Sequence, residues 1–117
     1  DGELVLGQDK SPLFKTMFHI AIENSQSEYY ITEKITDCFR SFVVPIYYGA
    51  TKIANYFNTR GIITVNSIDE IIDACNNITI STYTDMLPYI LENYEISSNY
   101  IDLNNRVKEI IKNKLIL

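Results

Sequence analysis

The apolar residues of this chain form short continuous runs that alternate with helical stripes. Phe18–Ile22 is a short, mostly apolar run rich in branched side chains, which is typical of a buried strand. Residues 43–48 and 62–65 have the same character and predict two further strands. Pro45 suits the start of a strand or an irregularity better than a central position, because proline cannot donate a hydrogen bond to a neighbouring strand.

Apolar residues that recur three and four positions apart predict helices between these runs. The first helix begins after Thr32, a candidate N-cap, with Glu33 in its first turn, where the helix dipole favours a negative charge. Its buried face is expected to contain Ile31, Ile35, Cys38, Phe39 and Phe42. The second helix begins at Ser67, which forms a capping-box pattern with Glu70. Its apolar stripe contains Ile68, Ile71, Ile72 and Cys75.

Residues 52–57 predict a short helix, and two longer helices are expected in the last third of the chain. The first of these opens at Thr84 or Asp85, because Pro88 is tolerated only in the first turn of a helix. Its buried stripe is expected to contain Leu87, Ile90, Leu91 and Tyr94. The last helix covers residues 103–117. Its apolar side contains Val107, Ile110, Ile111 and Leu115.

Strands that alternate with helices predict an α/β fold, a parallel sheet with helices on both faces. Ligands of such sheets bind at the carboxyl ends of the strands. Those ends are polar or small here: Glu23-Asn24-Ser25, Tyr48-Gly49-Ala50 and Asn66-Ser67. By its length, the chain is a single domain over residues 1–117. Because it starts at Asp1 rather than Met, we expect it to be a piece of a longer protein.

Composition narrows the classes of function. Hydrophobic residues make up 46% and charged residues 21%, which indicates a globular chain. A net charge of −5 argues against a nucleic-acid surface, although a phosphate site needs only one or two cations. No run reaches the roughly 18 apolar residues of a membrane segment. One histidine and two cysteines without a Cys-x-x-Cys pattern indicate no metal site.

Several reactive side chains have a structural interpretation. His19 lies inside the first strand and is expected to be a structural histidine rather than a general base. Cys38 and Cys75 fall on apolar helix faces and are expected to be small core residues. Tyr47 and Tyr48 point to opposite faces of their strand, and the sequence leaves open which of them lines a cleft.

The loop after the first strand has the chemistry of an anion site, because free N–H groups and the helix dipole at a helix N-terminus attract negative charge. Lys34 lies in the first turn, where the dipole disfavours a cation, and a nearby anion explains that position. On this interpretation Lys34 neutralises a diphosphate and Glu33 accepts hydrogen bonds from ribose hydroxyls. Asn24 and Ser25 contact phosphate or sugar, and Tyr30 contacts the ribose or base. The alternative is an ordinary solvated helix start, and the residues alone leave both open.

Three segments of the chain form a longer ordered pattern. They are Phe18-x-Ile20-Ala21-x-Glu23-Asn24-Ser25, Tyr30-Ile31-Thr32-Glu33-Lys34 and Val44-Pro45-Ile46-Tyr47-x-Gly49. The pattern resembles the donor-binding motif of the α-1,3/4-fucosyltransferases, glycosyltransferase family 10. The resemblance implies the C-terminal, Rossmann-like half of a two-domain GT-B glycosyltransferase, with GDP-fucose held by this half. The donor-binding residues that it implies are Asn24, Ser25, Tyr30, Thr32, Glu33 and Lys34.

By this resemblance Lys34 neutralises the diphosphate, Glu33 binds the ribose and Thr32 caps the helix. The implied reaction is inverting transfer of fucose from GDP-fucose to an N-acetylglucosamine or glucose hydroxyl of a glycan. The general base and the acceptor contacts belong to the N-terminal domain, so we expect no catalytic residue in this chain and no activity from it alone. GDP-fucose or GDP is the expected ligand, as a substrate or product, and no other cofactor is expected.

Two features depart from the family pattern. Ser41-Phe42-Val43 stands where the family usually has small residues, often with a glycine, and we expect Phe42 to pack on the buried helix face. Lys10 and Lys15 are upstream, where the family has a second basic residue, but neither aligns with it. Two alternatives stay open: a non-catalytic nucleotide-sugar-binding or interaction module, and a GT-B glycosyltransferase that uses another nucleotide sugar.

Overall fold

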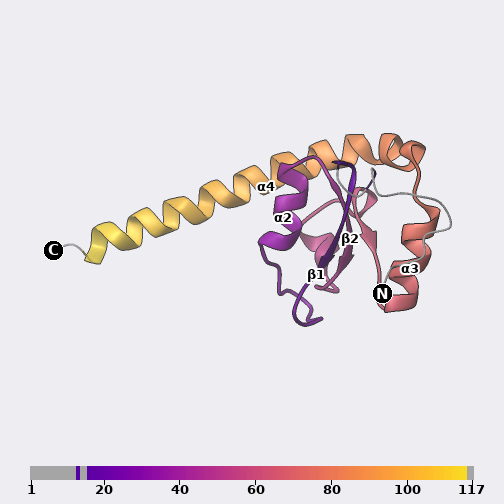
Figure 1. Cartoon of the computed structure of the whole chain (residues 1–117). Coiled ribbons are helices and arrows are strands. Elements are labelled where there is room, and N and C mark those ends of the chain that lie inside the picture. The colour runs from indigo at the N-terminus through magenta and orange to yellow at the C-terminus, as the bar shows by residue number, and fades with distance from the viewer. Residues whose placement is uncertain (1–12, 14–15, 116–117) are drawn as a thin grey trace.

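The computed structural model describes residue 13 and residues 16–115, and only the backbone of residues 100–102 and 104. Lys10 and Lys15 therefore lie outside the described residues. A three-stranded parallel sheet in the order β1-β2-β3 forms the centre of the molecule (Figure 1). Its strands are β1 (Phe18–Ile22), β2 (Val44–Tyr48) and β3 (Ile63–Thr64). The predicted strands and their parallel arrangement are thus confirmed.

Pro45 stands in the central strand, a position that the sequence did not favour. The N–H of Val44 donates to the carbonyl of Met17, on the β1 side, at 2.8 Å. Backbone groups of successive residues point to opposite sides of a strand, so the nitrogen of Pro45 faces β3. Pairing of β2 with β3 starts only at Ile46. The missing N–H of Pro45 therefore costs no hydrogen bond between the strands.

Helices cover both faces of the sheet, as expected. The helix α2 (Glu33–Arg40) packs on one face together with the short 3₁₀ turn η1 (Ile53–Asn55). The buried core on that side consists of Ala21, Ile35, Cys38, Phe39, Tyr47, Ile53, Phe57 and Ile62. The other face is covered by α3 (Ile68–Asn77) and the first part of α4 (Ile80–Leu115). Its buried core consists of Phe18, Val44, Ile46, Val65, Ile71, Cys75, Ile78 and Ile90.

The end of α2 corrects the position expected for Phe42. This residue is not on the buried helix face: it follows the helix with φ of 56° and is 40% exposed. The N–H of Val43 donates to the carbonyl of Cys38, and the N–H of Phe42 donates to that of Phe39. This is a Schellman motif, whose left-handed residue is usually glycine. This geometry explains why the family often has a glycine in the segment where this chain has Phe42.

The helix α3 agrees with the sequence at its start and differs from it on its face. Ser67 accepts a hydrogen bond from the N–H of Glu70 at 3.2 Å, which confirms the N-cap. Ile71 and Cys75 are buried, but Ile68 is 74% exposed. The expected stripe is therefore too long by one turn. The segment predicted as a short helix at 52–57 contains only the turn η1, and a second 3₁₀ turn, η2, covers Thr59–Gly61.

A single helix of 36 residues, α4, replaces the two helices predicted for the last third of the chain. It starts after Thr79, whose hydroxyl accepts from the N–H of Thr82, while the hydroxyl of Thr82 accepts from the N–H of Thr79. Pro88 lies inside it, contrary to the expectation of a first-turn proline. Thr84, four positions earlier, and Pro88 are both exposed. The carbonyl that loses its helical partner therefore lies on the solvent side.

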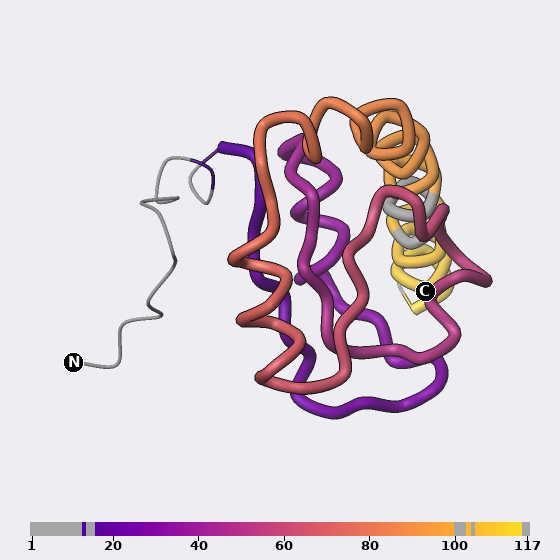
Figure 2. The backbone as a smooth tube through the Cα atoms, turned by 90° about the vertical axis from the view of Figure 1, so that its right-hand side faces the viewer, coloured from indigo at the N-terminus to yellow at the C-terminus, as the bar shows by residue number. Residues whose placement is uncertain are grey.

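The C-terminal part of α4 extends away from the sheet, as the yellow end of the helix in Figure 1 and the nearly end-on view in Figure 2 make clear. The molecule accordingly measures 61 × 28 × 26 Å. The apolar side predicted for this segment is between 45% and 78% exposed, as is Leu91 at 47% further up the helix. Its residues are Val107, Ile110, Ile111 and Leu115. Among the described residues, no helix has the length and apolarity needed to cross a bilayer.

Candidate functional site

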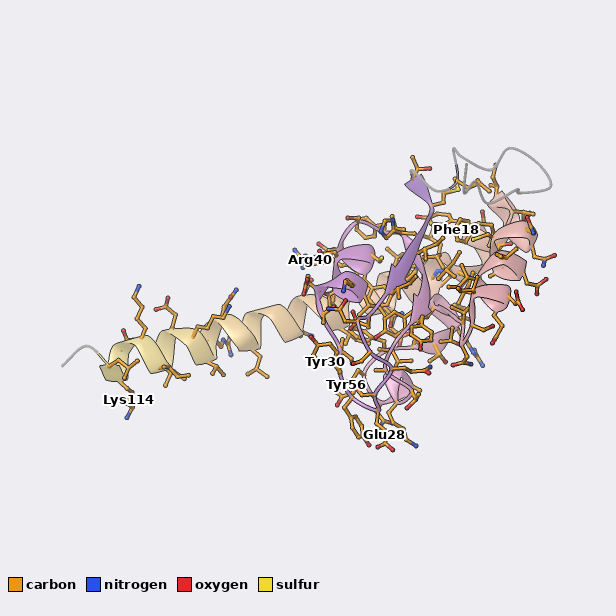
Figure 3. All side chains as sticks on the ribbon, turned by 60° about the horizontal axis from the view of Figure 1, so that its bottom comes forward. Phe18, Glu28, Tyr30, Arg40, Tyr56 and Lys114 are labelled. Carbon is orange, nitrogen blue, oxygen red and sulfur yellow. The ribbon has the colours of Figure 1, made fainter. Side chains whose placement is uncertain are left out.

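The carboxyl ends of the three strands meet at one edge of the sheet, and the loop over residues 24–31 lies across them. The N–H of Glu23 donates to the carbonyl of Tyr48 at 2.9 Å, which continues the pairing of β1 with β2. The side chain of Gln26 donates to the side chain of Asn66, after β3, at 2.9 Å. Figure 3 places Glu28 and Tyr30 at this end of the molecule, opposite Phe18. The predicted convergence of polar strand ends is therefore present.

The first turn of α2 lies beside the end of β1. Thr32 caps the helix, because its hydroxyl accepts from the N–H of Lys34 at 3.2 Å. The ammonium of Lys34 lies 3.4 Å from the side-chain carbonyl of Asn24. Glu33 is exposed next to it. An ammonium has three N–H donors, so Lys34 can bind an anion in addition to Asn24.

Two of the predicted site residues stand apart from this group. Ser25 and Tyr30 are exposed, Tyr30 by 49%. The backbone N–H of Tyr30 donates to the hydroxyl of Ser27 at 3.1 Å, which forms a turn inside the loop. Within the described part of the chain, neither side chain is hydrogen-bonded to Lys34 or Asn24. The structure thus brings together Asn24, Thr32 and Lys34, and leaves Ser25 and Tyr30 facing solvent on the same loop.

Glu23 is a member of this site that sequence reasoning did not single out. Its side chain is only 2% exposed. The carboxylate accepts hydrogen bonds from the backbone N–H of Thr32, at 2.8 Å, and from the hydroxyl of Thr32. These bonds join the two ends of the loop across nine positions. The sequence feature that could have pointed to Glu23 is its position: it is a carboxylate directly after an apolar strand, and it lies within the first motif segment.

Tyr47 lies behind Glu23 on the central strand. Its hydroxyl accepts from the N–H of Ala50 at 3.1 Å. Burial raises the pKa of Tyr47, the bond from Ala50 lowers it, and the charge of Glu23 and a hydrogen bond with it raise it further. Tyr47 is therefore a buried packing residue, and Tyr48 packs against the opposite face. The two tyrosines point to opposite faces, as predicted.

Gly49 provides the space that this arrangement needs. A β-carbon at this position would collide with the hydroxyl of Tyr47 and with Cγ of Glu23. The residue after β2 therefore has to be glycine for both side chains to occupy their places. This gives a steric reason for the glycine that ends the third motif segment.

A groove of about 620 Å³ runs between β1 and α2, next to the site. Its polar lining consists of His19, Glu33, Lys34, Asp37 and Ser41. His19 is exposed and not buried in the strand. Among the described residues, β1 pairs only with β2. No group of three or more histidine, cysteine or acidic side chains among the described residues is arranged to hold a metal ion.

Comparison with known families finds a match over most of the chain. Residues 7–100 match the family described as Glycosyltransferase family 10 (fucosyltransferase) C-term. The chain belongs to glycosyltransferase family 10. The family match covers all three motif segments and both core clusters of the fold.

Individual relatives of this family 10 chain are much longer than it is. An alpha-(1,3)-fucosyltransferase of Helicobacter pylori is 34% identical over an alignment of 90 residues, and the match covers 73% of this chain and 18% of the relative. A crystal structure of an α1,3-fucosyltransferase with GDP is 36% identical, with a TM-score of 0.54. One with GDP-fucose is 35% identical, with a TM-score of 0.53. Each covers 60% of this chain and 22% of the solved chain. The chain therefore spans about a fifth of the length of these relatives.

Proposed function

We propose that this chain is the donor-binding part of a fucosyltransferase-like enzyme and that it binds GDP-fucose at the edge formed by the strand ends. The observation that carries the proposal is the position of Lys34, whose ammonium lies 3.4 Å from Asn24 in the first turn of a capped helix. A cation at this end of a helix is unfavourable unless an anion offsets it. The solved relatives with GDP and GDP-fucose support a nucleoside diphosphate as that anion.

The proposed contacts follow from the donors and acceptors at the site. Lys34 neutralises the diphosphate, on which negative charge develops as the bond to fucose breaks. Asn24 accepts from Lys34 through its carbonyl, so its amide NH₂ is available to a phosphate oxygen. Glu33 is exposed in the same turn and accepts hydrogen bonds from the ribose hydroxyls.

The remaining predicted donor-binding residues have other roles. Thr32 donates its hydroxyl to Glu23 and accepts from Lys34, so we assign it to the helix cap and not to the donor. Ser25 and Tyr30 are exposed on the loop above the strand ends. We assign them to the sugar and base of the donor, which extend from the diphosphate.

The proposed reaction of the whole enzyme is inverting transfer of fucose to an N-acetylglucosamine or glucose hydroxyl of a glycan. Inversion requires a general base that deprotonates the acceptor hydroxyl on the face opposite the leaving GDP. We assign that base and the acceptor contacts to the N-terminal part of the enzyme, outside this chain. The 117-residue chain alone is therefore expected to bind the donor without transferring fucose.

Calorimetric titration of the 117-residue chain with GDP-fucose, GDP and UDP tests this function. We expect GDP and GDP-fucose to bind and UDP to bind much more weakly. Equal binding of all three would favour a GT-B enzyme that uses another nucleotide sugar. Binding of none would contradict the proposed function and favour an interaction module.

A further inference from the structure

Both oxygens of the buried Glu23 carboxylate accept a hydrogen bond. A carboxylate removed from water is costly unless hydrogen bonds replace the lost solvent. Glu23 receives two bonds from Thr32, through the N–H and the hydroxyl. The hydroxyl of Tyr47, which accepts from the N–H of Ala50, lies beside Glu23 around Gly49. The side chain of Glu23 therefore lies between β2 on one side and the residue that caps α2 on the other.

The hydroxyl of Thr32 links this carboxylate to the proposed diphosphate site. Because the hydroxyl proton is directed to Glu23, the oxygen lone pairs are left for the N–H of Lys34, 3.2 Å away. The chain of contacts therefore runs from Glu23 through Thr32 to the backbone of Lys34. The other end of Lys34, its ammonium, reaches Asn24, which directly follows Glu23.

The support behind Glu23 is rigid. Tyr47 belongs to the central strand and is 2% exposed, and the backbone of Glu23 is paired with Tyr48. The space that a side chain at Gly49 would need is filled by Glu23 and Tyr47. The carboxylate therefore has a fixed position relative to the sheet. Because Thr32 is bonded to it and caps α2, the start of the helix is fixed relative to the sheet as well.

We infer that Glu23 is a positioning residue of the donor site: its buried carboxylate holds Thr32 and thereby sets the first turn of α2, with Lys34, against the end of β1. This inference rests on the proposed function. Glu23 does not touch the donor. It acts by fixing the orientation of the cap hydroxyl and by closing the loop over residues 24–31, so that Lys34 and Asn24 meet at one point.

The test is the GDP affinity of the 117-residue chain, measured by calorimetry at a temperature where circular dichroism finds every variant folded. Glu23→Gln keeps the shape of the side chain and removes its charge, and we expect about tenfold weaker binding. Glu28→Gln is the matched control, because Glu28 lies exposed on the same loop. Its affinity should equal that of the unchanged chain. Thr32→Val should weaken binding in the same way as Glu23→Gln, and Thr32→Ser should regain most of that loss.

A double-mutant cycle separates positioning from general stabilisation. If Glu23 acts through Lys34, the chain with both Glu23→Gln and Lys34→Ala should bind GDP no more weakly than the one with Lys34→Ala alone. Additive losses would overturn the inference, as would full affinity in Glu23→Gln. Either result leaves the proposed function intact. If Glu23→Gln does not fold, the comparison of Thr32→Val with Thr32→Ser decides the question, since equal affinities would overturn the inference. An unchanged chain that does not bind GDP would overturn both the proposed function and this inference.

Discussion

The ring of Phe42 stacks on the ring of Tyr94, with centroids 4.8 Å apart and planes inclined by 20°. The guanidinium of Arg40 lies 5.4 Å from the centre of the same tyrosine ring. These contacts join the end of α2 to α4. They also explain how a phenylalanine is tolerated at a left-handed position, because the stacking offsets part of the backbone strain.

This relationship predicts an unusual order of stability at position 42. Phe42→Ala removes the stacking and keeps a β-carbon in the left-handed region, whereas Phe42→Gly removes both. We expect the glycine variant to be more stable than the alanine variant by about 1 kcal/mol. Urea unfolding followed by circular dichroism measures the difference. Asp37, an exposed position inside α2, is the control. There the alanine variant should be more stable than the glycine variant, because glycine weakens a helix interior. An alanine variant at 42 as stable as the glycine variant would contradict the left-handed geometry.

Lys34→Ala should weaken binding of GDP by about 2 kcal/mol or more, from loss of a charge-assisted contact with the diphosphate. The measurement is calorimetry with GDP and with guanosine, which lacks the phosphates. Guanosine affinity should change little, because the lost contact is with the diphosphate. Lys112→Ala, an identical change on the exposed distal part of α4, is the control and should bind GDP as the unchanged chain does. Equal losses for GDP and guanosine would argue against a diphosphate contact.

Gly49→Ala should destabilise the fold by about 1–3 kcal/mol, because the added methyl group collides with Glu23 and Tyr47. Chemical denaturation measures the change. The same variant should bind GDP more weakly, since displacement of Glu23 also displaces Thr32. A variant with unchanged stability would mean that the buried contact of Glu23 with Tyr47 and Gly49 is not formed.

Because the thiol of Cys38 is buried, we expect the folded chain to lose stability at alkaline pH. Burial, and then the nearby charge of Asp37, raise the pKa of its thiol from 9.0 to about 11. The folded state therefore keeps a proton that the unfolded state releases, so stability falls as pH rises from about 9 to 11. The full loss for such a shift is at most about 2–3 kcal/mol. Denaturation across this range should give a shallower fall for Cys38→Ala than for the unchanged chain. A parallel pH dependence in both would contradict the burial of the thiol.

Local patterns were sufficient for the elements that depend on near neighbours. The run Phe18–Ile22 is a strand, and Thr32 and Ser67 are N-caps, because each depends on residues within one turn or one strand. The proximity of Lys34 to the cap was predictable for the same reason, since both lie in one helical turn. The order of strand, loop and helix also placed Asn24 near Lys34.

Other features depend on contacts between distant parts of the chain. The Pro88 pattern predicted a helix start, yet α4 continues through it because that side of the helix faces solvent. Phe42 has helical spacing, but the return of the chain from α2 to β2 forces it into the left-handed region. Ile68 belongs to an apolar stripe and is nevertheless 74% exposed, because the sheet covers only part of α3.

The strands, the caps and the family motif could be predicted from the residues, because all of them rest on short-range spacing and hydrogen bonding. The burial of Glu23, its enclosure by Tyr47 and Gly49, and the hold of its carboxylate on Thr32 became evident only from the folded chain. The physical reason is that burial depends on which surfaces pack together, and Glu23 meets partners nine and more than twenty positions away. A polar residue after a strand is equally compatible with a solvated loop, until the packing of β2 against β1 removes the solvent.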